Sequence, residues 1–229
     1  MQSRANKLLT LESPSKKQII EAQNLFKEAK RKKRSKESIL NRIEFHKKKI
    51  SNIEYCELFL DSLKYEEVND DRLASIIELK EEIEEFICLK KVNPKFKSKK
   101  KKKQTSKIKE IQSPNGLRIQ IGSNNRQNEL ISLKQGTKGD LWFHAQEIPG
   151  SHVVLKSSNG FTDDKDIQLA ADLASFFSRA RGSKLIPVIM VTIENLQRIS
   201  GALPGTVKHR GGKVLWGKAE RAQKYFHQK

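Results

Sequence analysis

The feature that most constrains the fold is a stretch without proline or glycine, Ser15 to Leu63, which directly follows Pro14. Its apolar residues recur at spacings close to three, four and seven, as in a helix with one buried stripe. His46 and Glu57 interrupt that stripe where an apolar residue would be expected. The pattern predicts a long helix that begins near Ser15 and forms part of a coiled coil. Its stripe consists of Ala22, Phe26, Ala29, Ile39, Ile43, Ile50, Ile53, Leu60 and Leu63.

A second helix is predicted from Asp71 to Lys90, after a turn at Asn69 to Asp71. Its apolar residues share a face opposite a cluster of acidic side chains, so the two helices could bury their stripes against one another as an antiparallel hairpin. We expect residues 1–92 to form this extended helical coiled-coil arm. The apolar face consists of Leu73, Ile76, Ile77, Leu79, Ile83, Phe86 and Ile87, and the acidic face of Glu81, Glu82, Glu84 and Glu85.

Basic residues are concentrated in two blocks. Lys99 to Lys103 lies in a segment with few apolar residues, and we expect residues 93–110 to be a lysine-rich flexible linker. This run is either a simple spacer or a tether that contacts phosphates. Lys30 to Arg34 lies within the predicted long helix, where it is either an ordinary solvated face or a contact for an RNA backbone.

From residue 111 onward the pattern changes to short strands and turns. A helix from Asp166 to Arg181, with acidic residues at its start and Gly182 as its stop, is the main helix predicted there. The expected fold class is α+β: the helical hairpin, then a small domain, residues 111–229, with a mainly antiparallel sheet and one main helix. The strands are predicted at Leu117–Ile121, Asp140–His144, Val153–Lys156, Leu185–Ile193 and Val214–Trp216.

The net charge of +19 favours a polyanionic partner, because each neutralised phosphate releases counterions. RNA fits this charge, and an anionic membrane surface is a weaker alternative. Cys56 and Cys88 form neither a metal motif nor a disulfide framework. The sequence contains no apolar run of about 20 residues, as a membrane span requires, and its first ten residues do not resemble a secretory signal. We expect a protein of the cytoplasm or of an organelle matrix such as the plastid stroma, with no membrane partner.

Two polar turns between Gly116 and His152 carry the strongest indication of function. Asn124, Asn125 and Gln127 offer paired donors and acceptors for ribose or base edges, and Arg126 offers a fork for phosphate. The asparagines could instead cap the turn or adopt left-handed geometry.

His144 and His152 are predicted at the ends of neighbouring strands and could form structural hydrogen bonds or contact RNA. Two histidines alone supply too few ligands for a metal site. The position of Ser151 next to His152 in the sequence does not by itself make a catalytic nucleophile with a general base. Whichever of Trp142 and Phe143 faces outward could stack on an unpaired base. At the end of the main helix, the cations at 179, 181 and 184 either offset the helix dipole or contact phosphate. The RNA-binding candidates are Asn124, Asn125, Arg126, Gln127, His144, Ser151, His152, Arg179, Arg181 and Lys184.

Several separated blocks resemble the RNA-binding module of the NFACT family, a family of ribosome-quality-control factors formerly called fibronectin-binding proteins. The family also places a helical coiled-coil arm before this module. The blocks are Gly122 with Asn124, Asn125 and Gln127–Asn128; Asp140 to His144; Ile148 to Val154; Ala170 to Ala174 with Ser178 to Arg181; and Ser200 to Ala202 with Pro204–Gly205.

The resemblance implies a recruiting factor that binds the large ribosomal subunit, with its ribosomal RNA, and tRNA, and that rescues stalled nascent chains by alanine tailing. It implies no catalytic residues, no metal and no cofactor in this chain. The motifs of the family's amino-terminal domain have no counterpart, which leaves open a separate partner chain that supplies that half, or a truncated RNA binder that acts alone. A fibronectin-binding adhesin and a small hydrolase that uses Ser151, His144 and His152 are the alternatives.

Overall fold

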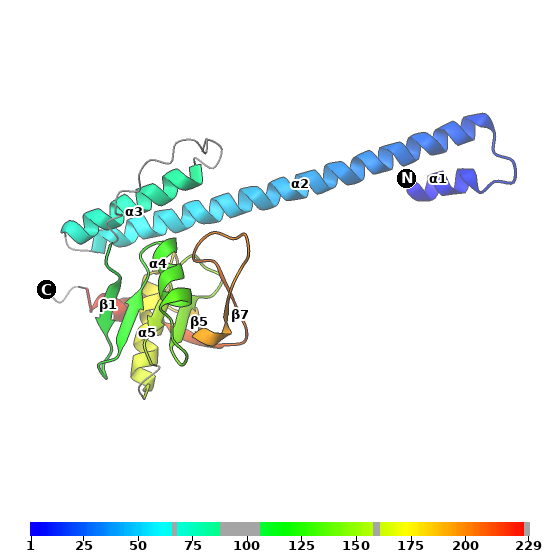
Figure 1. Ribbon diagram of the computed structural model, residues 1–229. Helices are drawn as coiled ribbons and strands as arrows, with labels where there is room; N and C mark the ends of the chain where they lie inside the picture. The colour runs from blue at the N-terminus through cyan, green and yellow to red at the C-terminus, as the bar shows by residue number, and fades with distance from the viewer. Residues whose placement is uncertain (66–67, 88–105, 158–160, 227–229) are drawn as a thin grey trace. The chain divides into compact units, whose positions relative to one another are not determined.

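The computed structural model describes residues 1–65, 68–87, 106–157 and 161–226, and the chain divides into two compact units, Met1–Asn52 and Ile53–Lys229. Helix α2, Lys16–Ser62, runs uninterrupted through the boundary between the two units (Figure 1). Ser15 begins it with a reciprocal cap, in which Ser15 N donates to Gln18 Oε1 over 2.8 Å and Gln18 N donates to Ser15 Oγ over 3.4 Å. The predicted long helix and its start are confirmed.

The first unit contains a short helix that the sequence did not predict, α1, Gln2–Leu9. It packs on the first turns of α2, where Ala5 and Ala22 are fully buried. Arg4 Nη2 and Glu21 Oε1 form an ion pair of 2.9 Å beside them. Because α1 is brief and mostly polar, its apolar spacing is too short to stand out from a loop.

The predicted stripe of α2 is covered only in part. Ile39, Ile43 and Ile50 are 53%, 45% and 56% exposed, so the coiled coil does not extend along the whole helix within the described residues. Near the carboxyl end of α2, Cys56 and Phe59 pack against Leu79 of helix α3, Asp70–Ile87. The 3₁₀ turn η1, Leu63–Tyr65, follows α2. The predicted hairpin is therefore present, as a short contact.

The buried face of α3 differs from the prediction. Leu73, Ile76 and Ile77 of the expected apolar face are 40% to 56% exposed, whereas the acidic Glu82 is buried. Asn69 caps the helix as expected, since its Oδ1 accepts a hydrogen bond from Arg72 N over 2.9 Å. Glu78 and Glu82 accept hydrogen bonds from polar groups of the globular domain, while Leu79 packs against α2, so hydrogen bonding and apolar packing together determine which face of α3 is buried.

The predicted linker, 93–110, lies mostly outside the described residues, and so does its lysine run, 99–103. The described chain resumes at Ser106, which donates from its backbone N to Glu78 Oε1 over 3.0 Å. Strand β1 then begins at Lys109. Residues 106–110 therefore belong to the globular domain.

A six-stranded antiparallel sheet in the order β1-β2-β4-β3-β5-β8 organises this domain, as the predicted fold class requires. Strand β1 and a separate pair of strands, β6 and β7, were not predicted, because each is short and mostly polar. The strands are β1 Lys109–Gln112, β2 Arg118–Ile121, β3 Leu141–Ala145, β4 Val153–Leu155, β5 Ile186–Thr192, β6 Leu196–Arg198, β7 Val207–His209 and β8 Lys213–Gly217.

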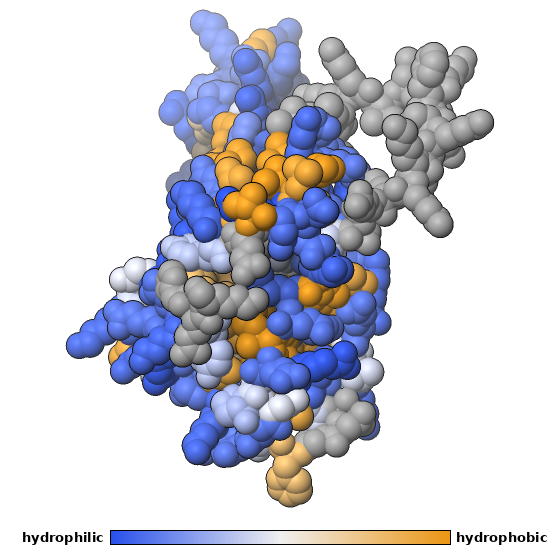
Figure 2. Space-filling view, turned by 90° about the vertical axis from the view of Figure 1, so that its left-hand side faces the viewer, coloured by the Kyte–Doolittle hydropathy of each residue, from blue (hydrophilic) through white to orange (hydrophobic). Residues whose placement is uncertain are grey.

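Apolar clusters cover both faces of the sheet. On one face, Phe143 and Leu155 pack against Leu173 of the main helix α5, Asp164–Phe176, with α6, Ala219–Gln223, at its side. On the other face, Trp142 and Val191 lie in a smaller cluster with side chains of β6 and of the helical segment α4–η2. That segment comprises α4, Asn125–Glu129, and η2, Leu130–Lys134, and the short turn η3 spans Ile193–Asn195. The face seen in Figure 2 is mostly hydrophilic, with apolar side chains in separate groups.

Helix α5 is shorter than predicted. Asp163 and Asp166 form a capping box at its start, as the acidic residues there suggested. It ends at Phe176 rather than at Arg181, because the next residues pair with the loop at 149–151: Ser151 N donates to Phe177 O, and Arg179 N to Pro149 O, each over 2.9 Å. Gly182 is therefore not the helix stop.

Candidate nucleic-acid interface

The first polar turn of the signature caps a helix. Asn124 is the N-cap of α4, and its Oδ1 accepts a hydrogen bond from Gln127 N over 2.8 Å. The side chain of Gln127 closes the turn from the other side, since its Oε1 accepts a hydrogen bond from Ser123 N over 2.9 Å. The capping alternative for Asn124 is confirmed.

The remaining donors of this turn contact the acidic face of α3. Asn124 Nδ2 donates to Glu78 Oε2 over 2.9 Å, and Asn125 Nδ2 donates to Glu82 Oε1. Arg126 Nη2 lies 2.7 Å from Glu85 Oε2, and Arg126 Nη1 lies 3.6 Å from Glu81 Oε2. Carboxylates of the chain thus occupy the positions that phosphate or ribose oxygens would take in the predicted RNA contact.

Burial limits what these side chains can reach. Asn124, Asn125 and Gln127 are only 2% to 6% exposed. Burial raises the pKa of the Glu82 carboxyl, and the hydrogen bond from Asn125 and the charge of Arg126 oppose that shift. Among the four predicted RNA-binding residues of the turn, Arg126 alone retains partial exposure, about 31% of its side chain.

The two turns of the signature are joined by hydrogen bonds between their backbones and side chains. Gly122 N donates to His152 O over 3.1 Å, and His152 N donates to Asn128 Oδ1 over 3.0 Å. Gly122 has no room for a side chain, because an added Cβ would lie 2.1 Å from Asn128 Oδ1. Ser151 is buried, and its backbone pairs with Phe177. Much of the signature therefore serves to hold the fold.

The two predicted histidines lie together around a tryptophan. Trp142 stacks on His144 with ring centroids 5.6 Å apart, and His152 meets each of these rings edge-on at 5.0 and 5.3 Å. Burial lowers the pKa of His144 to about 4, and burial followed by the neighbouring His144 lowers the pKa of His152 well below its ordinary value. Both imidazoles are neutral at pH 7 and carry no charge for a phosphate.

The hydrogen bonds of these histidines favour a structural role. His144 Nε2 lies 3.2 Å from Gly150 O, and His152 Nδ1 lies 2.8 Å from Ser132 Oγ. The structure brings Ser132, not Ser151, to His152, and both side chains are buried, so the Oγ of Ser132 is not open to a substrate. In the described ranges no three His, Cys, Asp or Glu side chains are grouped as a metal site would require.

Trp142 cannot be the base-stacking residue that the sequence suggested. Trp142 and Phe143 do point to opposite faces of β3, but both are buried, at 2% and 0% exposed. The reason is that the face without α5 also carries a layer of structure, which alternation along one strand cannot reveal.

The cations near 180 occupy different surroundings from one another. Arg179 Nη1 lies 3.2 Å from Glu54 Oε1, and Arg181 Nη2 lies 3.3 Å from Asp61 Oδ2, both on the carboxyl-terminal part of α2. Lys184 is exposed. Because α5 ends before them, the two arginines bind acidic groups rather than offset a helix dipole.

A further basic segment of the domain, residues 207–218, was not among the predicted RNA-binding residues. Lys208, Arg210 and Lys213 are exposed and Lys218 is partly exposed. The segment has no acidic residue, and among the described residues none of these four cations forms an ion pair. The signal was available in the sequence as Lys-His-Arg-Gly-Gly-Lys, a basic turn with two glycines.

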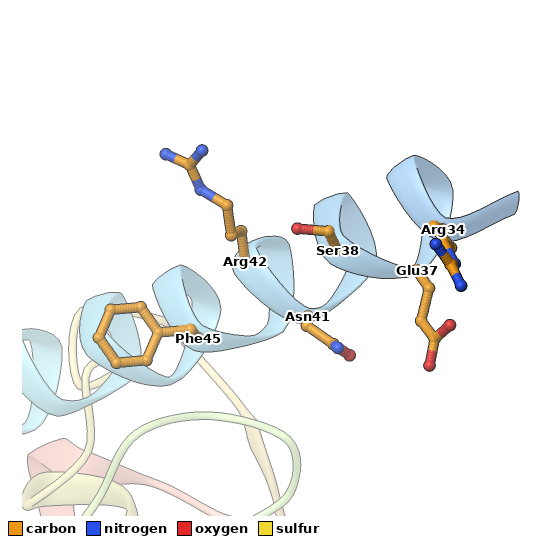
Figure 3. Close-up of a pocket in the computed structure, with 6 residues that line it drawn as sticks. All are labelled: Arg34, Glu37, Ser38, Asn41, Arg42 and Phe45. Carbon is orange, nitrogen blue, oxygen red and sulfur yellow. The ribbon is translucent and has the colours of Figure 1, made fainter. Parts of the chain in front are cut away.

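Two surface hollows do not add a further site. One, of about 420 Å³, is lined from Arg34 to Phe45 by α2 alone, and the side chains point in different directions from that one helix (Figure 3). The other, of about 550 Å³, combines Lys107, Arg118 and Lys156 with Glu110 at the β1–β2 edge. Lys156 there is committed to the fully buried Asp140. No helix in the described part of the chain has the length and apolar character of a membrane span.

Comparisons with known proteins agree on one family. Residues 107–211 match the family described as NFACT protein RNA binding domain. The protein named Rqc2 homolog RqcH of Streptococcus suis is 34% identical over 194 residues, which cover 85% of this chain and 33% of that protein. Its namesake in Bacillus subtilis is 35% identical over 157 residues, which cover 69% of this chain and 26% of that protein. The chain thus spans about a third or less of the length of these curated relatives.

A solved structure gives the same result. The carboxyl-terminal part of the fibronectin/fibrinogen-binding protein from Streptococcus suis is 34% identical, with a TM-score of 0.70, and the match covers 89% of this chain and 78% of that one. The matching fold, the family match and the shared signature together place this chain in the NFACT family, with the RNA-binding domain of that family at residues 107–211.

Proposed function

We propose that this chain binds RNA on the ribosome as a quality-control factor, with the large ribosomal subunit and tRNA as its partners in the cytoplasm or an organelle matrix. Its role is to recruit and position, and it contributes no catalytic residue to peptide-bond formation. The observation that carries the proposal is the coincidence of an NFACT RNA-binding domain with the cations of residues 207–218, which form no ion pair with any residue that the structure describes. Such cations supply the sequence-independent part of RNA affinity.

The contacts of the signature turn bear on where the RNA binds. Asn124 and Asn125 are bound to α3 and Gln127 is bound to Ser106, so these side chains could meet RNA only if α3 and the segment at Ser106 moved away. The exposed 207–218 segment requires no such movement. We therefore assign the main phosphate contacts to Lys208, Arg210 and Lys213.

Co-sedimentation with free large ribosomal subunits at a series of salt concentrations tests this assignment. Replacing Lys208, Arg210 and Lys213 with Gln should weaken binding and flatten the salt slope by about 1 to 3, because each lost phosphate contact removes slightly less than one unit. A matched variant replaces Lys48, Lys64 and Lys80, each paired with a nearby acid on its own helical segment, and removes the same charge. If wild-type binding does not depend on salt, or both variants lose affinity equally, the assignment is wrong.

Alanine addition needs a separate test. That activity is inferred for full-length members of the family, and this chain spans about a third of the length of such a relative. We expect no alanine addition by this chain unless a protein that supplies the amino-terminal part of the family is present. A ribosome-coupled tailing assay with and without such a protein measures this directly.

A fibronectin-binding adhesin is the second candidate, favoured by the name of the solved structure from Streptococcus suis. Immobilised fibronectin should then retain the chain after ribonuclease treatment, and added RNA should not compete. Retention that RNA abolishes would instead reflect the same basic surface acting on another polyanion.

A further inference from the structure

The largest exposed aromatic side chain of the sheet is Trp216 on β8, at 58% exposed. Strand β8 is the last strand of the six and pairs on one side with β5. The backbone of Trp216 is fixed, because its O accepts a hydrogen bond from Gln168 Nε2 of α5 over 3.0 Å. An apolar ring is thus displayed on a rigid element, at a position beyond the residues that match the family domain.

The neighbours of Trp216 determine which face of the sheet it occupies. Gly217 faces α5, because a Cβ added there would lie 2.6 Å from Ala171 O, and the adjacent Trp216 therefore faces away from α5. In register, Trp216 pairs with Pro187 and Val214 pairs with Ile189. Pro187 O accepts a hydrogen bond from Gln146 N over 2.8 Å, which places Gln146 next in the same row.

This surface, here called the Trp216 platform, consists of Gln146, Pro187, Trp216, Ile189 and Val214. Trp216 and Val214 are about half exposed, Pro187 is half-buried and Gln146 is exposed, whereas Ile189 is buried and belongs to the apolar cluster on this face of the sheet. Neighbouring strands lie about 4.8 Å apart, and Gln146 is two strands away from Trp216, so their backbones lie about 10 Å apart. That distance is close to the width of one base together with the edge that forms hydrogen bonds. The platform is flat, apolar at its centre and polar at one side.

Cations border the platform. Arg210 belongs to the turn that leads into β8. Lys213 is three residues from Trp216, so alternation along the strand places it on the α5 side of the sheet and outside the platform. Lys218 follows two residues after Trp216 with an extended backbone, and it has no ion pair among the residues that the structure describes. An apolar partner protein would gain nothing from these charges, whereas a nucleotide offers a ring for the indole and a phosphate for the cations.

We propose that the Trp216 platform binds an unpaired nucleotide of RNA, with the base stacked on the Trp216 indole and its phosphates held by Arg210 and Lys218. The inference rests on the RNA binding proposed above and adds a preference for single strands. A sheet surface with exposed aromatic side chains suits unpaired bases, which can be splayed out and stacked, while bases within a duplex are not available. Stacking also tolerates any base, so the platform would not read sequence.

The test compares full-length wild type with Trp216→Ala and Trp216→Phe for binding to a labelled oligouridylate and to an RNA duplex of equal length. Trp216→Ala should weaken single-strand binding about 5- to 150-fold, as the loss of one stacked base predicts. Trp216→Phe should retain most of the affinity, and duplex binding should change little. The salt slope should stay the same in both variants, because no charge is removed.

Phe161→Ala is the matched control, since Phe161 is fully exposed outside the platform, and it should leave both affinities unchanged. Circular dichroism shows whether each variant folds. Equal losses for single strand and duplex, or unchanged single-strand binding by Trp216→Ala, would overturn the platform while RNA binding itself stands. No RNA binding by the wild type would overturn the proposed function instead. A Trp216→Ala variant that loses only self-association, measured by light scattering, would identify the platform as a protein contact.

Discussion

At the level of single residues, much of the polar signature is engaged in hydrogen bonds within the chain. His152 is an example: its backbone N, its backbone O and its imidazole Nδ1 are bound to Asn128, Gly122 and Ser132 respectively. The sequence could predict that these residue types form turns, because Asn and Gly have known turn chemistry. It could not predict the partners, since hydrogen bonds between residues 20 to 30 positions apart depend on how the strands are ordered.

The neutral state of His144 leads to a prediction on acid stability. Its pKa in the folded chain is about 4, lowered chiefly by burial, and the unfolded value is about 6.5. Between these values the unfolded chain binds more protons, so the free energy of unfolding falls as pH decreases from about 6.5 to 4, by up to about 3 kcal/mol from His144. In urea titrations across this pH range, the free energy of unfolding should fall less in the His144→Gln variant than in the wild type.

His46→Gln is the control for this measurement, because His46 is an exposed residue of α2 and its loss should leave the pH dependence as in the wild type. Parallel curves for the wild type and His144→Gln would show that His144 gains a proton in the folded chain as readily as in the unfolded one.

At the level of elements, local sequence patterns predicted the main helices and most strands of the sheet, but not which of them pack against one another. Strands β2, β3, β4, β5 and β8 were predicted from local strand and turn patterns, and the start of α5 from Asp163 and Asp166. The ends and faces of the helices were not: α5 stops early because its next residues pair with the loop at 149–151, and α3 turns its acidic Glu82 toward α4. Both outcomes were decided by hydrogen bonds to distant segments, which helical periodicity does not contain.

The contact of α3 with α4 predicts a distinct pattern of stability. Glu82→Ala should lower the free energy of unfolding by about 1 to 3 kcal/mol, because it removes the carboxylate that the buried Asn125 amide binds. Glu82→Gln should cost much less, since the Gln carbonyl can accept the same hydrogen bond and burial already disfavours the charged carboxylate, whose pKa is raised. Denaturant titration of both variants measures the difference.

Glu84→Ala provides the comparison on the same helix, because Glu84 is exposed and lies 3.9 Å from Lys80 in a single surface ion pair. Glu84→Ala should lower the free energy of unfolding by at most about 0.5 kcal/mol. If Glu82→Ala and Glu84→Ala are equally mild, the hydrogen bond to Asn125 does not stabilise the domain.

At the level of the whole molecule, composition gives the net charge and favours a polyanionic partner, but it does not indicate which surface carries unpaired charge. The net charge of +19 is spread over both units: residues 1–52 carry 15 Lys and Arg against five acidic residues. In the globular part, by contrast, Arg126, Arg179 and Arg181 are paired with acids, whereas within the described residues Lys208, Arg210, Lys213 and Lys218 form no ion pair. Counting charges cannot separate these cases, because pairing depends on tertiary contacts.

The basic block of α2 should contribute part of the salt dependence of binding to the large ribosomal subunit. Lys30 to Arg34 are exposed residues of this helix, with Lys32 paired to Glu28 over 2.9 Å. Replacing all five with Gln should preserve the helix, because Gln is a good helix former. Successive residues point around the circumference, so only some can meet one RNA backbone, and the salt slope for large-subunit binding should fall by about 1 to 3 rather than by the full five contacts. Circular dichroism and co-sedimentation measure the two effects, and an unchanged slope would mean that the block is an ordinary solvated face.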